Sequence, residues 1–504
     1  MNKKIVNIVD FVRRETNSPY DMIKPVVEEI KINKEYNLPS TILLHYNCII
    51  DETYTSLFLK EDCDLIEYGI WLELSKTLVE KCGFDWRGSE EWEWHVVPGY
   101  LEAYTQEQRK VLIDEIFNEF KKVFGYYPKV VGNWIFDAFS MNYMCEKYGI
   151  DAFCNCREQY GVDAYTLWGG YYNGGYYPSK NNALCPAQNQ KNKIDAPCFR
   201  MLGSDPIYNY LDDYSKEDYT PNLWPVHSLE PGWDCGRIES CVDWYFRTYF
   251  EMPYVSYQHL TTGQENGFGW EVYGKGYLMQ MKKIAEYRDA GLLTVEKLGE
   301  TGRNFKKAYK ETPPTVLLAN EDWAGCNTLS AWYNSINYRS NSFLLNNRLY
   351  FRDIRKYDDK YQERYLEKPC ETWSGKYDCL PIMDMRKWRN GEDGQNRSEC
   401  YFVNKVDSIK FDSEGEELTV IIKYSDGKIG SILYKKDKIV IYGNSDVNYI
   451  LHGAEAQISL NGNSLEFIYE NYKYKMTVNA KIEKFERGYV FKPIDNKIEF
   501  CLNG

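Results

Sequence analysis

The first part of the chain alternates short apolar runs with amphipathic segments of helical period. Apolar runs bounded by turn residues indicate buried strands, and apolar positions recurring with helical spacing indicate helices. The clearest helices are expected at 105–125, 140–149 and 273–291. The expected strands are 4–12, 40–50, 63–71, 92–100, 129–136, 151–158 and 254–262. Strands that alternate with helices in this way predict an α/β fold with a parallel sheet, closed or nearly closed into a (β/α) barrel.

The pattern changes near Pro313 and Pro314. From there on, short runs of alternating apolar and polar residues are separated by turn residues, which is typical of an all-β sandwich. The segments "SDGK" (425–428) and "NGNS" (461–464) are hairpin turns by composition. We therefore expect two domains, a barrel at 1–312 and a β-sandwich at 313–504.

An irregular segment at about 161–253 interrupts the barrel pattern. It is rich in Tyr, Gly, Pro, Asn and Asp, and long irregular segments in compact domains are often functional loops. Its most unusual part is "LWGGYYNGGYYPSKNNALCPAQ" (167–188), which combines aromatic rings with pliable glycine backbone. Such a stretch either folds onto its own core or forms the wall of a sugar pocket. We expect the pocket wall, with Trp168 and Tyr171 contacting substrate.

Charge and hydropathy exclude several classes of function. The 61 basic and 74 acidic residues give a net charge of −13, which argues against a nucleic-acid binder. No run approaches the roughly 20 apolar residues of a membrane span. The first residues lack the apolar stretch of a secretory signal, so a cytoplasmic location is expected. The aromatic content of 16% indicates a chain that is folded throughout.

The cysteines and histidines show no metal-binding spacing. The fifteen cysteines are scattered without a C-x-x-C motif, so we expect reduced, mostly buried thiols. The five histidines lie at 45, 95, 227, 259 and 452, and none are three or four positions apart. We therefore expect no metal and no cofactor.

Active sites of parallel barrels lie at the carboxyl ends of the strands. This rule selects one set of candidate substrate-binding residues: Asp10, His45, Glu67, Trp71, His95, Trp134, Arg157, Glu158 and His259. Their aromatic members offer wide contact surfaces at low entropic cost. Histidines near strand ends could serve as acids or bases, although a structural role is the alternative.

Two carboxylates that flank a glycosidic bond are the usual equipment of a glycosidase. The candidates are Asp137, Glu73 and Glu265. Asp137 follows the apolar segment that ends in Trp134, and its alternative role is a helix N-cap. Glu73 could instead be an ordinary acidic residue at the start of a helix. Glu265 lies in a glycine-bounded loop, where the alternative is a solvated charge.

The layout "DFVR…LLHYN…IEYGIWLE…GNWIFDAFS…YGIDAFCNCREQYG…YQHLTT…AGLLTVEKLGETG" resembles the glycoside hydrolase/deacetylase superfamily. That superfamily contains the (β/α)7 barrels of NodB-like deacetylases and family 57-like glycosidases. The chain is also similar to an uncharacterised bacterial group within it that carries a C-terminal β domain. The resemblance implies a (β/α)7-type barrel followed by a C-terminal all-β sandwich.

The resemblance places individual residues as well. Asp10 falls where deacetylases hold a first-strand aspartate, and His259 falls near their last-strand histidine. Asp137 and a glutamate of "EYGIWLE" fall where glycosidases could hold acid and nucleophile. The chain lacks the Asp-Asp pair and the H-x-x-x-H motif with which deacetylases hold a metal. This departure favours a metal-free glycosidase.

The sequence therefore predicts a glycoside hydrolase that acts on short imported oligosaccharides and allows a homo-oligomer. The first alternative is a metal-dependent carbohydrate deacetylase with an atypical site near Asp10, His45 and His95. The second is a barrel that binds sugar without catalysis.

Overall fold

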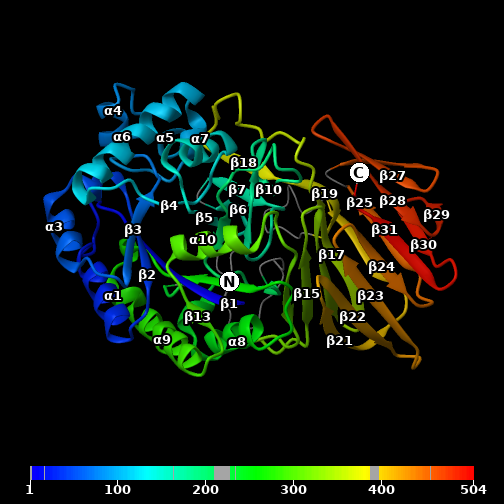
Figure 1. Cartoon of the computed structure of the whole chain (residues 1–504). Helices are drawn as coiled ribbons and strands as arrows, with labels where there is room; N and C mark the ends of the chain where they lie inside the picture. The colour runs from blue at the N-terminus through cyan, green and yellow to red at the C-terminus, as the bar shows by residue number, and fades with distance from the viewer. Residues whose placement is uncertain are drawn as a thin grey trace.

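The computed structural model describes residues 3–15, 17–162, 164–208, 228–232, 234–385, 397–453 and 456–503. A helix-flanked barrel built from the first part of the chain packs side by side with a β-rich C-terminal region (Figure 1).

The centre of the first part is a sheet of parallel strands in the order β12-β1-β2-β3-β4-β5-β11. Its strands are β1 Lys4–Val12, β2 Ser40–Leu44, β3 Ile66–Trp71, β4 Val130–Asn133, β5 Ala152–Cys156, β11 Cys198–Met201 and β12 Gln258–Thr262. Just beyond β11, the Gly203 amide donates to the Thr261 carbonyl of β12 at 3.0 Å. The two ends of the sheet therefore meet, and the sheet is nearly closed. A barrel-like sheet in an α/β fold is thus confirmed.

Helices surround the sheet, as the apolar pattern predicts (Figure 1). They are α1 Lys24–Glu35, α2 Tyr46–Ile49, α3 Glu52–Glu61, α4 Lys76–Lys81, α5 Val96–Gly99, α6 Gln106–Phe124, α7 Ala138–Tyr148, α8 Glu239–Phe250, α9 Trp270–Asp289 and α10 Leu298–Ala308. Helix α6 begins with a capping box between Thr105 and Gln108 and ends at Gly125, whose φ of +81° suits glycine. The three helices expected from periodicity are all present.

Strand β1 shows how the barrel separates its inner and outer faces, because successive side chains point to opposite sides. Phe11 reaches Trp71 of β3 across the lumen. Asp10, one residue earlier, accepts a hydrogen bond from Tyr277 of the outer helix α9. Positions in phase with Phe11 therefore face the lumen, and positions in phase with Asp10 face the helices.

The strand prediction fails at three places. The strand expected at 40–50 ends at Leu44, and Tyr46–Ile49 form helix α2 instead. Residues 92–100 form a loop and the short helix α5, so His95 is not on a barrel strand. Strand β11 lies inside the segment expected to be irregular, and its Cys198–Met201 run was too short to be recognised. Its pairing with β5, rather than its own sequence pattern, makes this segment a strand.

The C-terminal region consists of two antiparallel sheets that share one hydrophobic core. One sheet has the order β14 Thr315–Ala319, β15 Leu329–Asn334, β16 Tyr338–Leu345, β17 Arg348–Lys356, β20 Arg397–Phe402, β25 Val447–His452, β30 Gly488–Lys492 and β29 Lys481–Phe485, with β19 Leu380–Asp384 also paired to β17. The other has the order β21 Val406–Glu414, β22 Glu417–Tyr424, β23 Ile429–Lys435, β24 Lys438–Tyr442, β31 Lys497–Cys501, β28 Tyr472–Asn479, β27 Ser464–Tyr469 and β26 Gln457–Asn461. The two hairpin turns expected at 425–428 and 461–464 join β22 to β23 and β26 to β27.

The two regions are joined by a small mixed sheet. Strand β18 Gly375–Asp378 pairs in parallel with β7 Tyr165–Trp168, which pairs with β6 Gln159–Val162. Short strands follow β7 in the insertion: β8 Gly175–Tyr176, β9 Pro178–Ser179 and β10 Asn182–Pro186. The insertion therefore connects the barrel to the C-terminal region through strand pairing.

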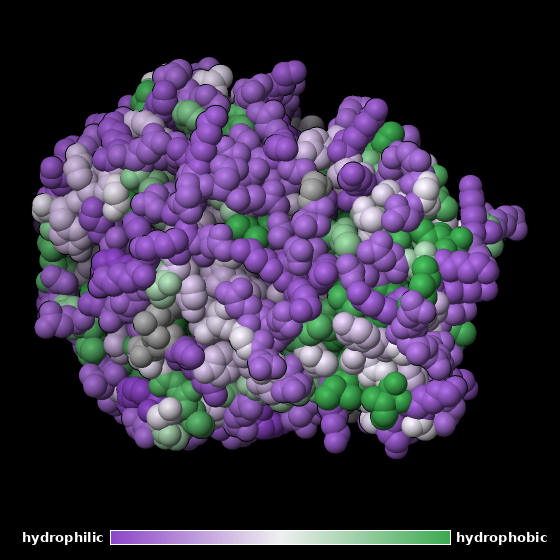
Figure 2. Space-filling model, turned by 45° about the vertical axis from the view of Figure 1, so that its right-hand side comes forward, coloured by the Kyte–Doolittle hydropathy of each residue, from purple (hydrophilic) through white to green (hydrophobic). Residues whose placement is uncertain are grey.

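Two further findings concern the cysteines and the surface. Cys235 and Cys241 form a disulfide, so the expectation that all thiols are reduced is wrong at this pair. On the face drawn in Figure 2, polar residues dominate, and apolar patches lie mainly over the C-terminal sheets. Among the described residues, no helix has both the length and the apolar character needed to cross a bilayer.

Candidate active site at the barrel mouth

Three charged side chains from different strand ends meet at the mouth of the barrel. Arg13 follows β1, Glu73 follows β3, and Glu265 follows β12. The Arg13 guanidinium donates to both carboxyl oxygens of Glu73, from Nε to Oε2 at 2.5 Å and from Nη2 to Oε1 at 3.1 Å. Its Nη1 pairs with Oε2 of Glu265. One guanidinium thus holds two carboxylates, and we call these three residues the mouth cluster.

Glu73 accepts two more hydrogen bonds from aromatic side chains. Trp71 Nε1 donates to Oε2 at 2.6 Å, and the Tyr100 hydroxyl donates to Oε1 at 3.4 Å. Hydrogen bonds to an ionised partner are roughly twice as strong as neutral ones. The carboxylate of Glu73 is therefore held in one position by donors on both oxygens.

Aromatic rings form the floor beneath the mouth cluster. Phe11 stacks on Trp71 with ring centroids 4.2 Å apart. Trp134 meets both rings edge-on, at 5.2 Å from Phe11 and 5.1 Å from Trp71. Trp71 lies two positions before Glu73, so strand alternation places both on the inward face. Arg13 and Glu73 each lie two positions beyond a floor ring, so the charged groups lie on the side of the floor toward the carboxyl ends of the strands.

His45 and Glu15 border the cluster. Burial, together with the positive charge of Arg13, lowers the pKa of the fully buried His45 to about 3. Burial raises the pKa of Glu15, the Arg13 charge opposes this rise, and the Glu73 charge adds to it. His45 is therefore a neutral imidazole at physiological pH, able to form hydrogen bonds but not to carry a proton charge.

A loop after β3 places a tryptophan against the cluster. The Arg13 guanidinium lies 4.3 Å from the centroid of the Trp92 ring, a cation–π contact. An isolated β-bridge joins Trp92 to Ser75, just after Glu73. The Glu265 side chain is 11% exposed and that of Glu73 only 1%, so Glu265 is the carboxylate that reaches solvent.

The structure brings together five residues that the sequence selected: Glu73, Glu265, His45, Trp71 and Trp134. Sequence reasoning gave no site role to Arg13, Tyr100 or Trp92. Arg13 had a usable signal, because it lies two positions beyond Phe11 and hence on the same inward face. Tyr100 and Trp92 lie in the loop mistaken for a strand, where no such rule applies.

Asp137, the leading catalytic candidate, is not part of the mouth cluster. It is the N-cap of α7, accepting from the Ser140 amide at 2.8 Å, and it pairs with Arg109 at 2.8 Å. Two more buried carboxyl groups, Glu102 and Glu363, lie beside it and feel its charge. The helix-cap role weighed for Asp137 is the one observed, and its side chain is 1% exposed.

Asp10 points away from the lumen, toward the helices. Tyr277 of α9 donates to its Oδ2 at 2.8 Å, and the Gln264 amide donates to its Oδ1 at 3.2 Å. Burial raises the pKa of Asp10 to about 7, while these hydrogen bonds and one with Asn33 oppose the rise. Because Asp10 faces the outer helices, the prediction that it lies at the barrel mouth is wrong.

Glu67 and His259 lie at the opposite, amino-terminal end of the barrel. Glu67 accepts from the Gly299 amide of α10 at 2.8 Å. His259 forms a hydrogen bond with Asn7 at 2.8 Å, and Asn7 in turn donates to Thr301 of α10. Helix α10 covers this end, so the prediction that Glu67 and His259 line the mouth is also wrong.

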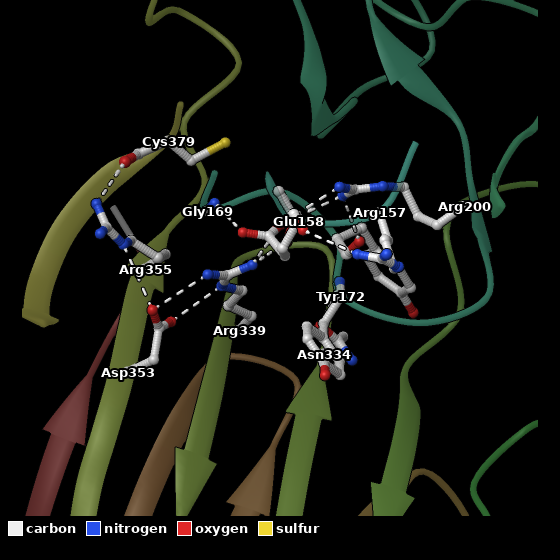
Figure 3. Close-up of polar contacts among 12 residues, drawn as sticks. Arg157, Glu158, Gly169, Tyr172, Arg200, Asn334, Arg339, Asp353, Arg355 and Cys379 are labelled. Atoms are coloured by element: carbon white, nitrogen blue, oxygen red, sulfur yellow. Dashed lines mark hydrogen bonds and ion pairs between the residues drawn. The ribbon is translucent and has the colours of Figure 1, made fainter. Parts of the chain in front are cut away.

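Glu158 belongs to a buried network at the junction with the C-terminal sheets (Figure 3). Its carboxylate pairs with Arg339 at 2.8 Å and with Arg200 at 3.4 Å. Arg339 also binds Asp353 at 2.9 Å, and Asp353 lies 3.6 Å from Arg355. We call Glu158, Arg200, Arg339, Asp353 and Arg355 the junction network.

Arg157, Trp168 and Tyr171 are also buried near this junction rather than lining the mouth. Arg157 lies beside Glu158 (Figure 3) and is 1% exposed. Trp168 packs in a core that includes Trp332, and the Tyr171 hydroxyl donates to the Pro313 carbonyl at 2.5 Å. The aromatic-glycine stretch is thus packed against the C-terminal sheets, and its expected role as a pocket wall is wrong for these two residues.

The described residues of the mouth do not fit a bound metal ion. Of the residues named for a metal-dependent deacetylase, Asp10 faces the outer helices and His95 lies in a loop beside Glu93. Across the described parts of the chain, no group of three or more His, Cys, Asp or Glu is arranged to hold a metal. Between the two carboxylates of the mouth lies a guanidinium instead.

Comparison with known proteins gives one family match and a set of structural likenesses. Residues 93–312 match DUF3863, a domain of unknown function with a solved structure. No curated protein matches the chain in sequence. In structure the chain is similar to a protein from Parabacteroides distasonis described as a "putative glycoside hydrolase/deacetylase", with a TM-score of 0.56 and 15% identity, over 77% of this chain and 93% of that one.

Two further solved structures are less similar to the chain. A "putative polysaccharide deacetylase" from Mycobacterium smegmatis has a TM-score of 0.36 at 11% identity, over 62% of this chain and 93% of that chain. A GH57 branching enzyme from Thermococcus kodakaraensis has a TM-score of 0.28 at 11% identity, over 62% and 72%. The chain therefore shares its overall fold with this Parabacteroides distasonis protein, and its residues 93–312 match DUF3863.

Proposed function

We propose that the chain is a glycoside hydrolase that cleaves a glycosidic bond in a short oligosaccharide, with Glu73 and Glu265 as its two carboxylates. The observation that carries this proposal is that one guanidinium, Arg13, binds both carboxylates above an aromatic floor. The fold likeness to a glycoside hydrolase/deacetylase protein supports the same class of substrate. Carbohydrate is thus the proposed partner of the mouth.

The two carboxylates differ in ways that assign their roles. Glu73 is fixed by Arg13, Trp71 and Tyr100, which suits a nucleophile that must hold its charge and position. Glu265 reaches solvent, which suits a residue that gives a proton to the leaving oxygen and then takes one from water. Arg13 positions both groups.

Their shared guanidinium favours the retaining outcome. Retaining enzymes hold their carboxyl groups about 5–5.5 Å apart, and inverting enzymes about 6.5–9.5 Å apart. Two carboxylates bound to one guanidinium suit the closer spacing. In the first step Glu73 would attack the anomeric carbon as Glu265 protonates the departing oxygen. In the second, water activated by Glu265 would release the sugar from Glu73.

Finer statements on architecture, location and partners belong to the same proposal. The barrel is of the (β/α)7 type, the catalytic domain spans 1–312, and the β-sandwich spans 313–504. The protein acts in the cytoplasm, without nucleic acid or membrane as partner. A homo-oligomer is compatible with these assignments.

The deacetylase alternative has less support, because its residues Asp10, His45 and His95 do not converge. The sugar-binding alternative predicts ligand affinity without turnover. A panel of aryl glycosides separates it from the proposal, since a binding protein releases no phenol.

Azide rescue tests the two roles directly. Glu73→Ala and Glu265→Ala each leave space for a small anion, so azide should restore product formation on an activated aryl glycoside. The Glu73→Ala product should be a glycosyl azide of inverted configuration, and the Glu265→Ala product one of retained configuration. Wild-type turnover that survives in both variants without azide would refute the proposal.

A further inference from the structure

Three aromatic rings form an exposed cluster beside the mouth. Trp94 stacks on His95 with centroids 4.1 Å apart, and Trp373 meets His95 edge-on at 4.7 Å. Trp94 is 46% exposed and Trp373 is 50% exposed. We call Trp94, His95 and Trp373 the aromatic platform.

This exposure sets the two tryptophans apart from others in the chain. The described tryptophans that are buried include Trp71, Trp134, Trp168, Trp244 and Trp332. A large ring left in water gives up the free energy that its burial would contribute, roughly 25 cal/mol per Å². Clustered exposed aromatic rings usually mark a binding surface.

The platform lies next to the mouth cluster. Trp92, whose ring contacts Arg13, is two residues before Trp94, and two residues span at most about 7 Å. The β-bridge between Trp92 and Ser75 anchors this loop to the end of β3. A ligand that leaves the mouth over Trp92 therefore reaches Trp94 within roughly one sugar ring.

The platform is also held in shape by contacts from both regions of the molecule. The Val96 amide donates to the Trp373 carbonyl at 3.0 Å, which fixes a loop of the C-terminal region to the barrel loop. Glu93 accepts from the Ser89 hydroxyl at 2.9 Å and from the Glu90 amide at 3.1 Å, and it lies 3.4 Å from His95 Nδ1. The rings are thus presented by a braced loop.

We propose that the aromatic platform binds the sugar rings of an oligosaccharide beyond the ring cleaved at Glu73 and Glu265. This inference rests on the proposed function and narrows its substrate to glycans of several sugars. Flat indole faces suit the apolar faces of pyranose rings, and the His95 ring adds a polar edge. Because Trp373 comes from the C-terminal region, that region contributes to substrate selection.

The length of the oligosaccharide is the variable that tests the platform. Trp94→Ala and Trp373→Ala should each raise KM about tenfold for an oligosaccharide that extends past the mouth, and leave kcat/KM for a single-sugar aryl glycoside unchanged. The matched control is Tyr442→Ala, which removes a 43% exposed ring from β24 in the far sheet. It should change neither value.

A binding measurement keeps this test separate from catalysis. Titration of oligosaccharides of increasing length into Glu265→Gln protein, by calorimetry, should show affinity rising with length. That rise should be lost when Trp94→Ala or Trp373→Ala is added. If the platform variants lose the increase of affinity with length but the wild-type protein shows no turnover, the hydrolase proposal is overturned and the platform proposal stands. Length-independent affinity, or platform variants that match Tyr442→Ala, would overturn the platform and leave the hydrolase standing.

Discussion

The mouth cluster and the junction network are built from the same chemical groups but differ in access. Each sets an arginine between two carboxylates, with Arg13 between Glu73 and Glu265 in one, and Arg339 between Glu158 and Asp353 in the other. The Glu265 side chain is 11% exposed, whereas Glu158 and Arg339 are 0% exposed. The mouth cluster therefore has one side chain that reaches solvent, whereas Glu158 and Arg339 are enclosed by protein.

This difference teaches that residue type at a strand end does not by itself indicate a site. Glu158 and Glu73 both follow barrel strands and both bind arginine. The C-terminal sheets pack over Glu158, so its ion pairs join two regions of the protein (Figure 3). We therefore expect the mouth cluster to control turnover and the junction network to control stability.

The largest expected effect is on turnover by the mouth cluster. Glu265→Gln keeps the shape of the side chain and removes its acid–base chemistry, which is worth about 10²- to 10⁴-fold in rate. The rate of hydrolysis of the best aryl glycoside should fall by that factor, with the thermal midpoint nearly unchanged. A rate within threefold of wild type would contradict the assigned role.

The next effect is on stability at the junction. Arg339→Met leaves Glu158 and Asp353 with fewer positive partners in a buried place, and breaking such a pair costs about 3–5 kcal/mol. Urea unfolding should show that loss while the folded variant still turns over substrate. Arg247→Met, which breaks an exposed pair with Glu321, is the control and should cost at most about 1 kcal/mol.

A smaller effect depends on pH, through the carboxyl groups beside Asp137. Burial, together with the Asp137 charge, raises the pKa of Glu102 from 4.5 to about 8. The unfolded chain releases the Glu102 proton above about pH 4.5, whereas the folded chain holds it to about pH 8. The contribution of Glu102 to the stability of the folded chain therefore falls as pH rises between these values. The thermal midpoint of Glu102→Gln should decline less than that of wild type over this range. Parallel declines would show that Glu102 does not titrate as described.

The smallest effect is expected at the closed end of the barrel. Glu67→Gln weakens the acceptor for the Gly299 amide at the start of α10, and loss of such an N-terminal contact costs about 1 kcal/mol. Turnover should be unchanged, because Glu67 is remote from the mouth. A loss of turnover comparable with that of Glu265→Gln would contradict the assignment of the active end.

Much of the architecture was predictable from the sequence, because strands and helices with a clear period leave local patterns. The strands β1, β3, β4, β5 and β12 and the helices α6, α7 and α9 follow such patterns. Strand β11 does not, because its four residues depend on pairing with β5. The α/β class and the β-rich C-terminal region could therefore be predicted, but not every strand.

The site was predictable only in part. The direction in which a strand-end side chain points, and whether another element buries it, depend on the tertiary structure. Strand ends selected Glu73, Glu265 and His45 correctly as neighbours, yet the same rule selected Glu67 and His259 at the closed end. Nothing local shows that C-terminal sheets bury Trp168 and Tyr171. Counting alternation along β1 would have turned Asp10 outward and Arg13 inward.

The most direct test of the central claim is to trap the sugar on the enzyme. A 2-deoxy-2-fluoro glycosyl fluoride of the accepted sugar should label the protein covalently, and mass spectrometry of its peptides identifies the labelled residue. The mouth cluster predicts label on Glu73 and none in Glu73→Gln protein. Label on a peptide without Glu73, above all the one that contains Asp137, would contradict it.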